Sequence, residues 1–227
     1  MMPLRLQYAP HPYSRPDYGA KTQFTPDADE PAPLTADGIQ RLQQVVGTFL
    51  FYRIAIDCTA LVALGNLAAE QAKGTEKTAE NMVWFLNYMA TNPNATLRYH
   101  TIGMVLHYHS DASYLSEPKA QIRALDFFHL SDLAEDPTKA PTDKPTLNGA
   151  VHVMSVILRN IMASATETKF ADLFVTAKDS TFMQTTPVEM GDQQPPTPIC
   201  TDNQTSEGIA NRTIKQKRSK AIDMRFY

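Results

Sequence analysis

The sequence predicts an α/β protein in which a bundle of short helices precedes a sheet flanked by helices. Between residues 35 and 95, apolar residues recur every three to four positions, a period typical of amphipathic helices. Beyond residue 96 the apolar runs become short, aromatic and strand-like, and a helical period returns at residues 164–178. Because strands, a helix, another strand and closing helices follow one another, we expect a layered α/β or α+β structure there.

Residues 1–34 are expected to be an extended or disordered lead-in, because they contain seven prolines and no regular apolar period. Three helices should follow within residues 35–95. Thr35 or Asp37 can cap the first helix, and Thr75 with Thr78 can begin the third. The expected apolar faces comprise Leu42, Val45, Val46, Phe49 and Leu50, then Leu61, Leu64, Leu67 and Ala68, then Met82, Phe85, Leu86 and Met89.

The remaining residues, 96–227, are expected to supply the sheet and its helices. The helix at 164–178 has Phe170, Leu173, Phe174 and Ala177 on one side, which predicts its buried face. A proline-rich loop from Pro187 should precede the strand at 199–202. The other expected strands are residues 96–103, 104–110, 123–130 and 151–158, and the expected closing helices are 206–213 and 219–227.

Bulk composition bounds the function only weakly. The net charge of −3 and the pI of about 6.1 give no bulk argument for nucleic-acid binding. Cys58 and Cys200 lie far apart without metal or redox spacing, so we expect free thiols in a reducing compartment. No apolar run has the length of a signal-peptide core or of a membrane span, so a cytoplasmic or nuclear protein without membrane contact is expected.

Several segments resemble, in the same order, the reverse transcriptase polyprotein of copia-type retrotransposons. Residues 106–114 (LHYHSDASY) are similar to the first catalytic strand of its RNase H domain, and residues 199–204 (ICTDNQ) to the strand that carries the third carboxylate. Residues 219–227 (SKAIDMRFY) look like a later helix start, and residues 41–52 with 60–65 are similar to the link between palm and RNase H. The resemblance implies a helical thumb-like bundle at 35–95 and an RNase H-like mixed sheet at 96–227, truncated before its last strand and helix.

The family cleaves the RNA strand of RNA–DNA hybrids with Mg²⁺, which prefers several converging carboxylates. The resemblance assigns Asp111 to the first catalytic, metal-binding position and Asp202 to the third. It would place the fourth Asp beyond residue 227; Asp223 instead matches a position on an earlier helix.

The second carboxylate position is the main departure from the family. The family has Thr-Glu-Ala-Glu where this chain has Thr166-Glu167-Thr168-Lys169, so the metal-binding Glu is replaced by Lys169. Glu167 lies about 200° away around the helix, although a shifted register would make it the ligand. The resemblance therefore implies a degenerate active site with impaired Mg²⁺ binding.

Other motifs carry open alternatives. The paired-Asp motif of polymerases is absent, which predicts no polymerase activity. Residues 123–126 stand where the family has a glycine-containing turn, which would suit decay of the domain. His107 and His109, at i and i+2, suit either a transition-metal site or ordinary packing.

A basic run lies near the end of the sequence and suits either phosphate contacts or a solvated segment. The run comprises Arg212, Lys215, Lys217, Arg218 and Lys220.

The function expected from the family is ribonuclease H activity, lost in this copy. The alternative is a non-catalytic nucleic-acid-binding or interaction protein, with a hybrid, another nucleic acid or the rest of the polyprotein as partner.

Overall fold

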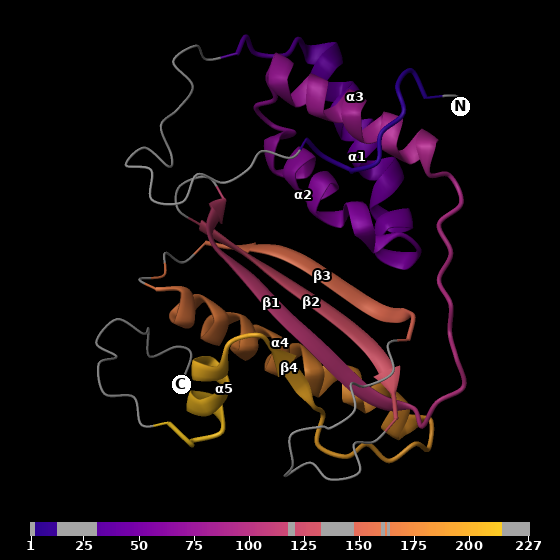
Figure 1. The fold of residues 1–227 in the computed structure, drawn as a ribbon. Coiled ribbons are helices and arrows are strands. Elements are labelled where there is room, and N and C mark those ends of the chain that lie inside the picture. The colour runs from indigo at the N-terminus through magenta and orange to yellow at the C-terminus, as the bar shows by residue number, and fades with distance from the viewer. Residues whose placement is uncertain are drawn as a thin grey trace. The chain divides into compact units, whose positions relative to one another are not determined.

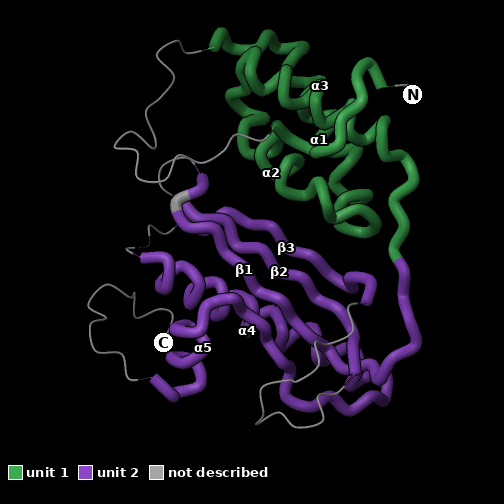
Figure 2. Tube along the Cα trace, viewed as in Figure 1, with its two compact units in different colours: residues 1–97 green, residues 98–227 purple. Residues whose placement is uncertain are grey.

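The computed structural model describes residues 3–12, 31–117, 121–132, 148–159, 162 and 164–214 (Figure 1). The chain divides into two compact units, Met1–Leu97 and Arg98–Tyr227 (Figure 2). The described part is mixed α/β, in agreement with the predicted class. No described helix is both long enough and apolar enough to span a bilayer.

Unit 1 contains helices α1 (Ala36–Ala55), α2 (Leu61–Glu70) and α3 (Glu76–Thr91), with a 3₁₀ turn, η1 (Cys58–Ala60), before α2. Thr35 caps α1 by accepting a hydrogen bond from the Gly38 amide at 3.2 Å, and Thr75 and Thr78 form a capping box at the start of α3. These helix starts were predicted. The residues of the predicted apolar faces are buried or half-buried, except Leu50, which is 47% exposed. The buried core comprises Leu42, Val46, Ala60, Ala63, Leu64, Leu67, Met82, Phe85 and Met89.

Two parts of the lead-in, residues 3–12 and 31–34, are described and contain no helix, and residues 3–12 pack along α3. The Leu4 amide donates to Asn87 Oδ1 at 2.9 Å, and the Gln7 amide donates to Thr91 Oγ1 at 3.1 Å. The Trp84 indole donates to the Ala9 carbonyl at 2.9 Å. Helix side chains therefore satisfy a backbone that has no secondary structure of its own, which apolar periodicity cannot reveal.

Unit 2 is built on a sheet that has four strands in the described residues: β1 (Val105–Glu117), β2 (Gln121–Ser131), β3 (Ala150–Leu158) and β4 (Ile199–Thr201). The strand order is β3-β2-β1-β4. β1 pairs antiparallel with β2 and parallel with β4, and β2 pairs antiparallel with β3. The sheet is therefore mixed.

One strand prediction is wrong, and another strand is longer than predicted. Residues 96–103 form no strand, and β1 continues past Ser110 to Glu117. Residues 123–126, which stand where the family has a glycine-containing turn, belong to the predicted strand and lie inside β2 opposite Ser113 to Ser110. There the Arg123 side chain is buried and donates to Glu117 Oε1 at 2.6 Å. The strand extends because cross-strand pairing satisfies its backbone through the polar residues that follow Ser110.

Helix α4 (Ala165–Glu189) lies along the sheet, and the short α5 (Gln204–Ala210) follows β4 (Figure 1). The predicted buried face of α4 is wrong, since Phe174 is 43% exposed and Ala177 is exposed. Instead α4 buries Glu167, Thr168, Ala171, Asp172, Thr176 and Ser180. It also runs through Pro187, which was expected in a loop and which removes one helical hydrogen bond close to the end of α4.

The apolar core of unit 2 is small. Leu106 and Tyr108 of β1 pack with Phe128 of β2, and the Tyr108 and Phe128 ring centroids are 4.1 Å apart. Ile122, Met162 and Ala171 form a second cluster. Between these clusters, polar side chains fill the contact between α4 and the sheet.

Candidate functional site

Parallel pairing of β1 with β4 brings Asp111 and Asp202 side by side. Ser110 of β1 is the register partner of Thr201 of β4, and Asp111 and Asp202 are the next residues along the chain. Their side chains are 64% and 69% exposed, respectively. The sheet thus presents two neighbouring carboxylates at one point of its surface.

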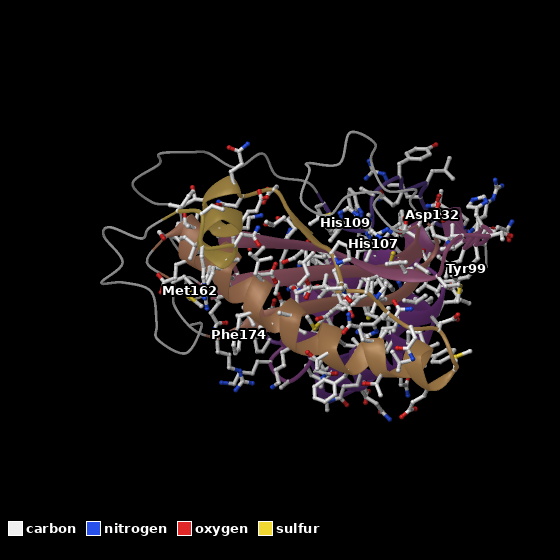
Figure 3. The ribbon with its side chains drawn as sticks, turned by 90° about the horizontal axis from the view of Figure 1, so that it is seen from below. Tyr99, His107, His109, Asp132, Met162 and Phe174 are labelled. Atoms are coloured by element: carbon white, nitrogen blue, oxygen red, sulfur yellow. The ribbon has the colours of Figure 1, made fainter. Side chains whose placement is uncertain are left out.

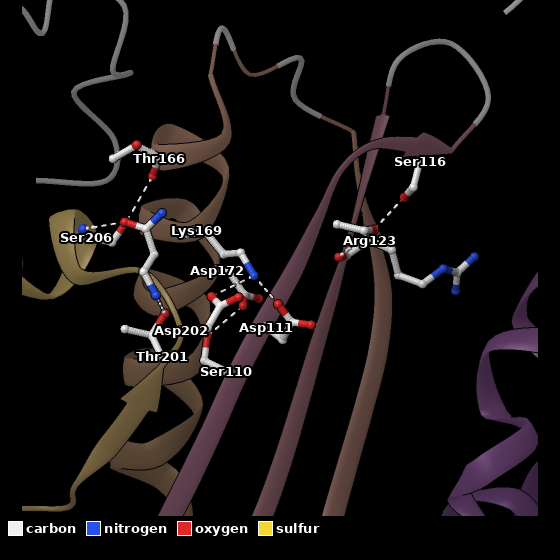
Figure 4. Close-up of polar contacts among 12 residues, drawn as sticks. Ser110, Asp111, Ser116, Arg123, Thr166, Lys169, Asp172, Thr201, Asp202 and Ser206 are labelled. Atoms are coloured by element: carbon white, nitrogen blue, oxygen red, sulfur yellow. Dashed lines mark hydrogen bonds and ion pairs between the residues drawn. The ribbon is translucent and has the colours of Figure 1, made fainter. Parts of the chain in front are cut away.

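Lys169 of α4 lies between these carboxylates (Figure 4). Its Nζ atom is 2.9 Å from Asp202 Oδ1 and also contacts Asp111 Oδ1. The lysine side chain is 13% exposed. Burial alone would lower its pKa, but hydrogen bonds and charge attraction from both aspartates raise the pKa above its ordinary value. Lys169 is therefore a protonated cation held by two anions.

These residues do not fit a magnesium ion. Mg²⁺ requires oxygen ligands, and here an ammonium group contacts both carboxylates that would provide them. Among the described residues, no group of three or more His, Cys, Asp or Glu side chains is arranged to hold a metal. Asp111 and Asp202 are thus brought together, but around a lysine.

Glu167, the alternative ligand, is not the residue of α4 that meets these carboxylates. It lies in the first turn of the helix, is 2% exposed, and its amide donates to Ser164 Oγ at 3.1 Å. The alignment with the family that assigned Lys169 to the second carboxylate position agrees with the observed contacts. Of the apolar face used for that alignment, Phe174 is exposed, and Phe170 and Leu173 are half-buried.

The remaining predicted site residues fall mostly outside the described part of the chain, namely Lys215, Lys217, Arg218, Lys220 and Asp223. Arg212 is described. It is exposed at the end of α5 and has a positive φ of 58°. There the Thr213 and Ile214 amides both donate to the Gly208 carbonyl, at 2.9 and 3.0 Å, and close the helix.

Sequence reasoning missed a buried polar cluster next to this site. Ser110 Oγ donates to Asp172 Oδ2 at 2.6 Å, and Thr176 Oγ1 lies 2.5 Å from Asp126 Oδ1. Asp126 and Asp172 are 1% and 0% exposed. One signal was available, because polar residues recur at exact four-residue spacing on α4. They are Thr168, Asp172, Thr176 and Ser180.

Three histidines form a separate cluster. His107 and His109 of β1, labelled in Figure 3, alternate along the strand with Ser110, so they lie on the face of the sheet opposite to the contact of Ser110 with α4. The ring of His129 stacks on that of His109 with centroids 5.2 Å apart, and its centroid is 5.7 Å from that of His107. The rings of His109 and His129 are near-parallel, and those of His107 and His129 are tilted by 35°. Among the described residues, no three such side chains are arranged to hold a metal ion. His107 and His109 therefore pack with His129 and do not form a metal site here.

We expect the acid stability of unit 2 to depend on His129. Burial, together with the neighbouring His109 and His107, lowers its pKa from 6.5 to about 4. Between pH 4 and pH 6.5 the unfolded chain binds a proton that the folded chain does not bind. The free energy of unfolding is therefore highest above pH 6.5 and falls by about 1.4 kcal/mol per pH unit as the pH decreases towards 4. His129→Phe should remove this part of the slope, measured by hydrogen exchange of β2 amides. His11→Phe, in unit 1, is the control, and an unchanged slope in His129→Phe would contradict the assignment.

Comparisons of the chain with protein-family models, curated proteins and solved structures found no match.

Proposed function

We propose that unit 2 is an RNase H-like domain of copia-type retrotransposon origin that no longer cleaves RNA. The observation that carries this proposal is the position of Lys169, whose ammonium group contacts both Asp111 and Asp202. A nuclease of this class needs metal ions where that ammonium group lies. The remaining role would be non-catalytic binding of an RNA–DNA hybrid or another nucleic acid.

The arrangement of unit 2 supports this proposal in two ways. The strand order β3-β2-β1-β4, with β4 parallel to β1, agrees with the mixed sheet that the resemblance implies. The two aspartates that match family motifs, although 91 positions apart in sequence, are neighbours in space. Chance matches to two short motifs would not require this proximity.

Loss of cleavage is tested directly by incubating the full chain with a labelled RNA–DNA hybrid and Mg²⁺. We expect no cleavage above a no-protein control, because no metal can bind between Asp111 and Asp202 while Lys169 is protonated. Mg²⁺-dependent cutting that disappears in Asp111→Asn would overturn the proposal. Binding of the same hybrid, followed by fluorescence anisotropy, measures the remaining role.

If the basic run binds phosphate, hybrid affinity should fall steeply with salt. Each neutralised phosphate contributes about −0.7 to −0.9 to the slope of log K against log salt. Lys215→Ala with Lys217→Ala should therefore reduce the slope by about 1.4–1.8, measured by anisotropy over a salt series. The control is Lys73→Ala with Lys77→Ala in unit 1, which removes the same charge. Equal slopes in both double variants would assign the run to solvent.

A further inference from the structure

Two buried carboxyl groups, one on α4 and one on the sheet, have no cation among their hydrogen-bond partners. Asp126 of β2 and Asp172 of α4 are 1% and 0% exposed. Each has one oxygen bonded to a hydroxyl group, and the other oxygens, Asp126 Oδ2 and Asp172 Oδ1, have no partner. Two ionised carboxylates in this position would be strongly disfavoured, since neither solvent nor a salt bridge compensates them.

The hydroxyl of Thr176 shows where a proton is needed. Its oxygen lies 2.5 Å from Asp126 Oδ1 and 2.9 Å from the Asp172 carbonyl oxygen, and it carries a single proton. It can donate to only one of these acceptors. Both contacts are satisfied if Asp126 is protonated and donates to Thr176, which in turn donates to the Asp172 carbonyl.

We propose that Asp126 and Asp172 share a buried proton that holds α4 on the sheet, and that loss of this proton at alkaline pH loosens the helix. The pair is linked through Ser110, the register partner of Asp126 on β1, whose hydroxyl donates to Asp172. The proton belongs to the pair and not to one residue. This inference does not depend on the proposed function.

The charged and titratable groups around the pair favour retention of the proton. Asp179 of α4 and Asp111 of β1 add negative charge, and the Tyr108 hydroxyl of β1 is buried without a partner. Lys169 is the opposing cation, but Asp111 and Asp202 hold its ammonium group.

Burial is the largest cause of the raised pKa values, which are about 6 for Asp126 and about 8 for Asp172. Repulsion from the Asp126 carboxyl group raises the pKa of Asp172 further. A raised carboxyl pKa means that the folded state binds the extra proton. Its stabilising effect is full below pH 3.8 and is lost as the pH rises to about 8.

The test measures urea unfolding of the full chain by circular dichroism at pH 6, 7 and 8. Loss of one proton should raise the unfolding equilibrium constant about tenfold per pH unit. Asp172→Asn places a neutral amide at the same site and should flatten this slope. Asp192→Asn, the same change at an exposed position beyond α4, should leave the slope unchanged. A wild-type slope retained in Asp172→Asn would overturn the proposal.

Carboxyl ¹³C NMR of the wild-type chain keeps the test decisive if the variant fails to fold. A shared proton predicts two aspartate signals that titrate together at or above pH 6, far from the ordinary aspartate range near 4. Titration of every aspartate signal below pH 5 would overturn the proposal. A free energy of unfolding at pH 8 that differs between sodium, potassium and choline chloride would also overturn it, because a bound metal cation would then occupy the place of the proton.

Discussion

Lys169→Glu is expected to improve Mg²⁺ binding at Asp111 and Asp202. The substitution removes the ammonium group between Asp111 and Asp202 and adds a third carboxylate at the same point of α4. A pair of unit charges about 4 Å apart is worth roughly 4 kcal/mol at an effective dielectric of 20. The two aspartates are largely exposed, so solvent screening reduces this value, and we expect at least roughly a tenfold gain in affinity.

The thermal stability of this variant should respond to metal in a way that the native protein does not. In EDTA, three adjacent carboxylates without a cation should lower the melting temperature of unit 2. Mg²⁺ should restore it, because a ligand that binds only the folded state stabilises by mass action. The native chain should show neither effect. Differential scanning calorimetry and isothermal titration with Mg²⁺ measure both.

Lys178→Glu is the matched control, because it makes the same charge change on the same helix at an exposed position. It should not gain Mg²⁺ binding. If the native chain binds Mg²⁺ as tightly as Lys169→Glu, the ammonium group does not block the site. If Glu167→Gln in the Lys169→Glu background abolishes the new binding, Glu167 is the ligand and the register is wrong.

Phe85→Ala should be the most damaging single truncation in unit 1. The Phe85 side chain is 0% exposed and packs edge-on against Phe49, with ring centroids 5.3 Å apart. Removing a fully buried ring costs about 3–5 kcal/mol, because burial is lost and a cavity remains. Unfolding can be followed by fluorescence of Trp84, the single tryptophan, which lies in unit 1 on α3.

Phe51→Ala makes the same chemical change on α1, where the side chain is 78% exposed. Its effect should stay within about 0.5 kcal/mol. Similar losses in the two variants would mean that the α1–α3 packing differs from the structure.

The helices of unit 1 were predictable because each has a strong local signal. Thr35 and Thr75 are polar caps, and Leu42, Met82 and Phe85 belong to stripes of apolar residues with helical period. The approximate positions of β2 and β3 were equally accessible from their apolar runs. What remained uncertain locally were the strand ends, where Ser, Asp and Arg residues carry no strand signal of their own.

Helix α4 shows the limit of this reasoning. Its apolar residues indicated one face, yet Asp172 and Thr176 are buried and Phe174 is substantially exposed. Periodicity assumes that burial favours apolar side chains. It fails when the facing strands present Ser110 and Asp126, which form hydrogen bonds with polar groups on the helix.

The sequence by itself determined the class of fold and the positions of the three helices of unit 1, and the motif resemblance singled out Asp111, Lys169 and Asp202. Only the tertiary structure decided that these three meet, because parallel pairing of β4 with β1 and packing of α4 on the sheet join segments far apart in the chain. The tertiary structure also decided that Asp126 and Asp172 are buried together. Burial and the hydrogen-bond partners that compensate it depend on contacts between elements, which local patterns do not specify.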